Sequence, residues 1–224
     1  MTHPIERFVT ASNELLQRSM PFTMLCRDSS LQKDSIEEIK QWLKKIETKK
    51  REAKVRGDDD VANMLLSVGC ALGAVLACIQ MCLQLKNDQP HDAWRSLVYS
   101  QHAVTSAMRA HRACDNMAGL SEFLHEIEHQ LFPPQVFASV GAKFSRAFCS
   151  ICDSDYRDCN HITGRPYAGD FCSMVIRNSV VEEVSIVETP EDKACIVVST
   201  ADKNGRMLDR LSLLPSEDSN KDDD

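Results

Sequence analysis

Apolar residues recur every three or four positions through the first 131 residues, the spacing of one face of an α-helix. Pro133 and Pro134 end this pattern. Beyond residue 173 the period changes, and β-branched residues alternate in part with polar ones, as they do in strands. The pattern predicts helices over residues 4–19, 34–56, 61–85, 90–113 and 120–131, and two or three short strands between residues 173 and 200.

The predicted helix 61–85 carries no charge between Asp60 and Lys86, so it is long and apolar enough to cross a bilayer. A helical projection nevertheless gathers large apolar residues such as Val68 and Leu72 on one side. Gly73, Ala77 and other small or polar residues gather on the opposite side. Lipid contact gives no reason for this segregation, so we expect a central bundle helix rather than a membrane span. The small-residue side would suit a close contact in a homodimer.

These patterns predict a mainly α fold with a small β appendage. We expect a helical bundle over residues 1–133, a zinc-binding knuckle with short β-strands over residues 134–200, and a flexible acidic tail over residues 201–224. The tail ends in "SEDSNKDDD", which lacks the apolar residues that a core needs.

Charge is distributed unevenly between the two parts. Residues 1–148 hold 18 Lys and Arg against 17 Asp and Glu, whereas residues 149–224 hold 8 against 16. The acidic part is a poor nucleic-acid surface, because phosphate binding needs clustered cations. Five cysteines are scattered through helical sequence, and the N-terminus lacks the pattern of a signal peptide, which together predict a reducing cytoplasm. These cysteines are Cys26, Cys70, Cys78, Cys82 and Cys114.

The stretch "CSICDSDYRDCNH" gathers three cysteines and a histidine, and another cysteine follows eleven residues later. A Cys-x2-Cys turn can present two thiolates to one zinc ion, and a second pair of ligands completes the tetrahedron. Five residues are therefore candidates for four ligand positions, and the alternatives concern the third and the fourth ligand. Because a filled shell leaves no position for water, we expect a structural site. The predicted ligands are Cys149, Cys152, Cys159 and His161, with Cys172 as an alternative fourth ligand.

The segment "CSICDSDYRDCNHITGRPYAGDFC", followed by "EEVSIVETPEDKACI", resembles a Cys/His segment and an EVSIV strand of tailed-bacteriophage prohead-protease and related head-assembly proteins. The resemblance covers residues 149–197 and departs from the pattern at Asp153, where a Gly is usual, and at Glu191, where an Ala is usual. The helical region does not resemble the protease catalytic domain. The resemblance therefore implies a zinc-stabilised module in a prokaryotic or viral setting, without protease activity.

The segment "LHEIEHQL" matches H-E-x-x-H, in which two histidines one helical turn apart bind zinc and the glutamate acts as general base. The residues are His125, Glu126 and His129. Glu128 places a charge where such helices usually carry an uncharged residue, and no third ligand stands out downstream. The pattern favours an amphipathic helix, with a zinc-dependent hydrolase as the alternative.

Arg95 and His102 match the Arg-x4-6-His signature of helical HEPN-type ribonucleases, and Arg109 follows at the same spacing. Seven-residue spacing keeps all three on one flank of a helix, as acid–base chemistry would require. Such residues are also common on solvated helices. We therefore predict a non-catalytic interaction or adaptor protein that binds a protein partner or a second copy, with the ribonuclease as a second alternative.

Overall fold

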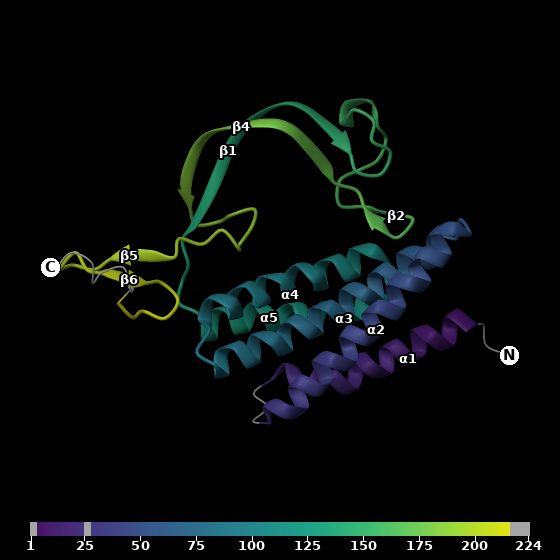
Figure 1. Cartoon of the computed structure of the whole chain (residues 1–224), viewed down its shortest axis with the longest axis horizontal. Coiled ribbons are helices and arrows are strands. Elements are labelled where there is room, and N and C mark those ends of the chain that lie inside the picture. Colours follow the sequence, from purple (N-terminus) through teal and green to yellow (C-terminus); the bar gives the residue numbers. More distant parts are fainter. Residues whose placement is uncertain (1–3, 25–27, 216–224) are drawn as a thin grey trace.

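The computed structural model describes residues 4–24 and 28–215. Five α-helices form a bundle, and a β-ribbon arches over it (Figure 1). Short 3₁₀ segments, η1 and η2, follow α1 and α4. The helices are α1 Pro4–Ser19, α2 Ser29–Val55, α3 Asp59–Lys86, α4 Pro90–Ala110 and α5 Ala118–Leu131; the 3₁₀ segments are η1 Met20–Thr23 and η2 Arg112–Met117.

The helix prediction was right in number and order, and it was wrong at two ends. Helix α2 begins at Ser29 rather than at residue 34, because the Asp28 carboxylate accepts hydrogen bonds from the N–H groups of Ser30 and Leu31. Helix α4 ends at Ala110, where His111 is extended and its ring nitrogen accepts from the Ala113 N–H. A side-chain cap therefore sets the start of α2, and the extended backbone of His111 ends α4.

Helix α3 lies at the centre of the bundle. Its large residues, including Leu65, Leu72 and Ile79, are buried in the core. Its small-residue side packs against α4 of the same chain, where Ser67 Oγ donates to Ala107 O at 2.7 Å and Ser100 Oγ to Ala74 O at 2.8 Å. The expected homodimer contact on this side is therefore wrong, because α4 occupies it.

By length and composition α3 could cross a membrane, and no other helix of the described residues could. Most of its apolar window is buried inside the bundle, as the core helix of a globular domain would be. Of the scattered cysteines, Cys78, Cys82 and Cys114 are buried and Cys70 is half-buried, whereas Cys26 lies outside the described residues.

Two long antiparallel strands, β1 Phe137–Cys149 and β4 Met174–Val187, form the ribbon, which we call the arch. The register runs from Phe137 opposite Val187 to Cys149 opposite Met174, with a bulge beside Gly141. The prediction of only short strands was wrong here. Residues 137–149 lack a clear alternation of their own. Their pairing partner in β4 lies beyond the Cys/His segment 149–173, and from here on the knuckle means this segment alone.

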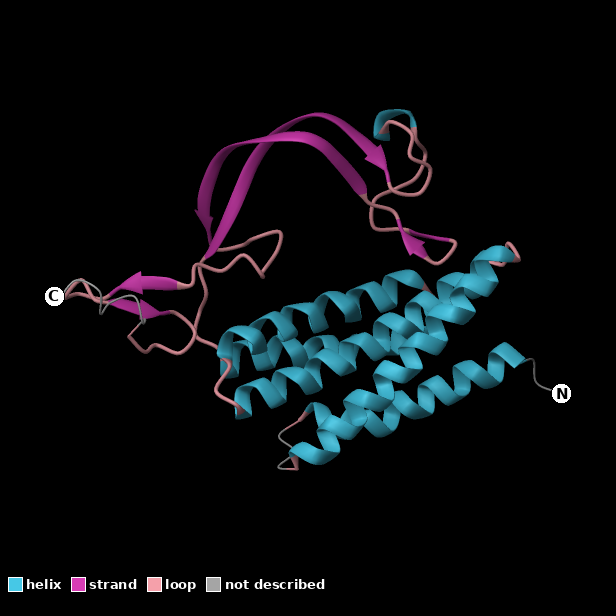
Figure 2. Cartoon of the chain, in the orientation of Figure 1, coloured by secondary structure: helices cyan, strands magenta, loops and turns pink. Residues whose placement is uncertain are grey.

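The arch is anchored to the bundle at both ends and bows away from it between them (Figure 2). At its base, Trp94 of α4 packs edge-on against Phe132 and contacts Phe137. At the other end, Arg109 of α4 lies beside Gly164 of the knuckle. A 13-residue strand is about 40 Å long, whereas Trp94 and Arg109 lie about 22 Å apart along a helix. The ribbon is longer than its base and must therefore curve outward.

Two short hairpins complete the chain. One pairs β2 Pro166–Tyr167 with β3 Asp170–Phe171, and the other pairs β5 Ser199–Ala201 with β6 Met207–Asp209. The second hairpin corrects the predicted tail, because residues 201–215 are structured: Leu211 is buried and Asp209 binds His91 of α4. The remaining tail residues, 216–224, lie outside the described part of the chain.

Candidate metal centre

The knuckle begins where β1 ends, and a tight turn brings its first two cysteines together. The Cys149 N–H donates to Ser154 O, and the Asp153 N–H donates to Cys149 O, both at 2.9 Å. Asp153 has φ = 55°, in the left-handed region that glycine favours and that aspartate tolerates. The 3₁₀ turn η3, Tyr156–Asp158, then leads the chain back to Cys159.

Four predicted ligands meet in this turn. The ligand atoms of Cys149, Cys152, Cys159 and His161 all lie within 4.8 Å of one another. Cys152 Sγ lies 3.6 Å from Cys159 Sγ, which lies 3.2 Å from His161 Nδ1. A tetrahedral ion with metal–sulfur bonds of about 2.3 Å separates its sulfurs by about 3.8 Å. The observed spacing fits such an ion, so these residues could hold a metal.

Cys172 stays an alternative fourth ligand. It is buried at the start of the returning chain, and its Sγ lies 3.7 Å from Cys149 Sγ, also close to one tetrahedral edge. Its N–H donates to Arg165 O, and the Gly164 N–H donates to Cys172 O, so the backbone fixes this sulfur beside the cluster.

The backbone around the cluster favours thiolates at the first two cysteines. Burial raises the pKa of Cys149, but N–H groups of Cys152 and Ile151 outweigh this and bring the pKa to about 7. Hydrogen bonds from Ser154 lower the pKa of Cys152. Burial raises the pKa of Cys159 to about 11 and also raises that of Cys172. Thiolate, the form that binds metal, is thus most accessible at the Cys-x2-Cys turn.

Tyrosines hold the second half of the cluster in place. The rings of His161 and Tyr167 are nearly perpendicular, with their centroids 4.6 Å apart, and the Tyr167 hydroxyl accepts from the Ile162 N–H. The Tyr156 hydroxyl binds Thr163 Oγ1 at 2.7 Å. These contacts orient His161 with Nδ1 toward Cys159.

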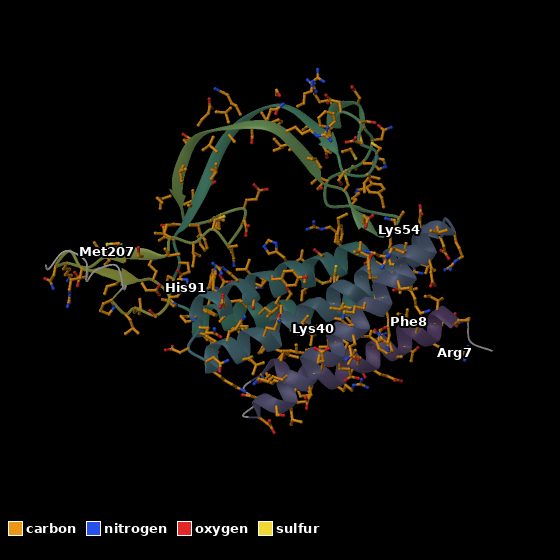
Figure 3. The ribbon with its side chains drawn as sticks, viewed as in Figure 1. Arg7, Phe8, Lys40, Lys54, His91 and Met207 are labelled. Carbon is orange, nitrogen blue, oxygen red and sulfur yellow. The ribbon has the colours of Figure 1, made fainter. Side chains whose placement is uncertain are left out.

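The knuckle is fastened to the bundle by residues that the sequence pattern did not single out. The Gly169 N–H donates to Asn63 Oδ1 at 2.8 Å, and Asp170 forms ion pairs with Lys50 and Lys54. Lys54 lies near the end of α2 closest to this hairpin, whereas His91 lies at the opposite end of the arch (Figure 3). No local signal marks Asn63 in sequence, because its partner is 106 residues away.

The His125–His129 segment lies on α5. His125 and Glu126 are exposed, and His125 Nδ1 binds Ser121 O one turn earlier. Among the described residues, no third side chain joins His125 and His129 in a group that could hold a metal. Glu128 instead points inward and binds Lys193 and Gln101. The structure does not assemble the second zinc site that H-E-x-x-H would require.

Arg95, His102 and Arg109 lie on the exposed side of α4. Arg95 pairs with Asp92 at 3.4 Å, while Arg109 lies beside Gly164. Within the described part of the chain, no hydrogen bond joins Arg95 to His102. The structure therefore places the pair on one helix without a direct contact between them.

Comparisons with protein-family models, with curated proteins and with solved structures found no match to this chain.

Proposed function

We propose that this protein is a zinc-stabilised interaction protein that acts by binding a protein partner or a second copy, without catalysis. We place it in the cytoplasm, in a prokaryotic or phage setting. The observation that carries the proposal is the arch, a long ribbon with exposed apolar residues that is anchored to the bundle only at its two ends.

Zinc suits this ligand set better than a hard cation, because three thiols and an imidazole are soft or borderline ligands. Cys149, Cys152, Cys159 and His161 would fill all four positions and leave none for a reacting water. The ion would then tie the end of β1 to the segment that leads into β4. Its contribution is to fix the far end of the arch.

The arch has the composition of a binding surface. Residues 142–146 of β1 and 174–186 of β4 are exposed, so both faces of the ribbon meet solvent. A two-stranded ribbon is marginally stable without packing, and large exposed apolar patches mark interaction sites. The seven exposed apolar residues of β4 are Met174, Val175, Ile176, Val180, Val181, Val184 and Ile186.

The resemblance of residues 149–197 to phage head-assembly proteins supports the same setting. Asp153, which replaces a usual glycine, adopts a left-handed conformation that aspartate tolerates. This departure from the pattern is therefore compatible with the same turn. An assembly protein also has use for an exposed apolar ribbon, whereas a monomeric enzyme does not.

Metal analysis of the purified chain tests the zinc site. We expect one zinc per chain, lost in Cys149→Ser and Cys152→Ser and retained in Cys195→Ser, whose exposed thiol lies outside the cluster. A second zinc that disappears in His125→Ala would contradict the non-catalytic proposal and favour the hydrolase. RNA cleavage abolished by His102→Ala would favour the ribonuclease.

Photo-crosslinking in the native host cells tests the binding role. A photoreactive residue at Val184, exposed on β4, should give a defined protein adduct. The same residue at Lys40, exposed on α2, serves as the matched control and should give none. Absence of any adduct from Val184 and from other arch positions would overturn the interaction role.

A further inference from the structure

One edge of the arch is open. All thirteen residues from Met174 to Ile186 are exposed, and in the described part of the chain β4 pairs only with β1. The second edge of β1 is different, because the segment around Ile196 covers its base: the Ala138 N–H donates to Cys195 O, and the Val197 N–H donates to Val136 O, both at 2.8 Å. An open apolar edge is a template for another strand.

The sequence of β4 is complementary to itself. In a two-fold antiparallel pairing centred on Val180, the position numbers of each facing pair add to 360. Arg177 of one copy then faces Glu183 of the other, and this occurs twice. Apolar residues face apolar residues or serine: the remaining pairs are Met174 with Ile186, Val175 with Ser185, Ile176 with Val184, Asn178 with Glu182, Ser179 with Val181, and Val180 with itself.

Neighbouring registers lose this match. In the neighbouring two-fold registers the facing positions add to 358 or 362. Arg177 then faces Val181 or Ser185, and Glu183 faces Val175 or Ser179. Facing charges of opposite sign stabilise a strand pair, whereas a charge facing an apolar side chain does not. Among these two-fold registers, charge complementarity therefore favours the one centred on Val180.

The charges within one copy support the same pairing of Arg177 with Glu183 of the partner copy. Arg146 of β1 lies directly opposite Arg177, a like-charge pair that a nearby carboxylate would offset. Arg177 also pairs with Asp153 at 3.1 Å, but both side chains are largely exposed, so this pair is weak. Glu183 makes no ion pair in the described part of the chain, and its side chain lies over Gly141.

The two irregular positions of β4 also face each other in this register. Glu182 is the extra residue of the bulge, and Asn178 has φ = 57°, outside the strand region. Because positions 178 and 182 add to 360, Asn178 of each copy faces Glu182 of the partner. The regular segments 174–177 and 183–186 then pair without a shift.

We infer that the chain forms a two-fold dimer in which the β4 strands of two copies pair antiparallel about Val180 and join the two arches into one four-stranded sheet. The inference rests on the proposed interaction role and names its partner as a second copy. Such a closed, isologous contact would cover the open edges of both chains.

Charge exchange in the zinc-loaded full chain tests the register by sedimentation equilibrium. We expect the wild type to dimerise, and Arg177→Glu or Glu183→Arg to weaken dimerisation about tenfold or more, because each places two like-charge pairs in the interface. The double variant should restore dimerisation to within about threefold of the wild type. Lys40→Glu on α2, exposed and outside the arch, is the matched control and should have little effect.

Circular dichroism of each variant would show that the fold is intact, so that a loss of dimerisation can be attributed to the interface. A monomeric wild type, a dimer unaffected by the single changes, or a double variant as weak as the singles would each overturn the inference. The crosslinking experiment at Val184 separates the two proposals. If the chain is monomeric and the adduct contains a different protein, the binding role stands and a second copy is ruled out as the partner.

Discussion

Glu128 shows how a single residue can belong to a catalytic motif in sequence and to the core in the structure. Its carboxylate accepts from Lys193 Nζ at 2.6 Å and from Gln101 Nε2 at 2.8 Å, and its side chain is only 13% exposed. Burial raises the pKa of Glu128, but the hydrogen bonds from Lys193 and Gln101 outweigh it, so the pKa lies below its ordinary value. Glu128 therefore fastens the segment after β4 to α5.

Replacing Glu128 with Gln should lower the free energy of unfolding at pH 7 by about 1–2 kcal/mol, because Lys193 loses its charged partner. Since the folded-state pKa is depressed, this contribution is present above the unfolded pKa, near 4.5, and is lost as the pH falls through the folded pKa. Urea unfolding at pH 7 and at acid pH would measure both effects. Glu126→Gln, exposed on the same helix, is the control; an equal loss there would contradict the assignment.

At the scale of elements, the β2–β3 hairpin connects the knuckle to the bundle through a glycine. Gly169 has φ = 81°, and a Cβ at this position would lie 3.0 Å from Lys50 Cγ and 3.2 Å from Ala62 Cβ. The backbone can approach α2 and α3 this closely only because the side chain is absent. The position of the knuckle therefore depends on this close approach as well as on the hydrogen bond to Asn63 and the ion pairs of Asp170.

Gly169→Ala should detach the hairpin from the bundle, and amide hydrogen exchange of residues 166–171 should become at least tenfold faster. Gly205→Ala is a matched control, since Gly205 has φ = 82° but nothing lies within 4 Å of an added Cβ. Both changes add backbone strain of about 1–2 kcal/mol, and only the first adds a clash. Equal exchange at residues 166–171 in the two variants would show that the contact does not hold the knuckle.

At the scale of the whole molecule, the bundle and the arch are stabilised by different forces. The helices enclose a continuous apolar core around α3, whereas the arch has little buried area between its anchors. The knuckle closes the far end of the ribbon through its Cys/His cluster. Loss of the proposed zinc should therefore affect the two parts unequally.

Removing zinc with a chelator should unfold the knuckle and loosen the arch while most of the far-UV helical signal remains. Hydrogen exchange should rise between residues 149 and 187 and stay slow in α3 and α4. Readdition of zinc should restore protection. Simultaneous loss of the helical signal would contradict the separation into a bundle and a metal-dependent arch.

The sequence by itself determined the helices and the Cys/His cluster that could hold a metal, because both depend on local spacing. The 3.6-residue period placed five helices in the right order. The four residues Cys149, Cys152, Cys159 and His161 lie within one short segment of sequence, so local folding can bring them together. The tertiary structure decided what depends on distant partners. Three contacts join residues far apart in sequence. Strand β1 pairs with β4, α4 packs against the small-residue side of α3, and Glu128 points inward and binds Lys193. Local patterns carry no record of such contacts, since the free energy that fixes them comes from packing between elements.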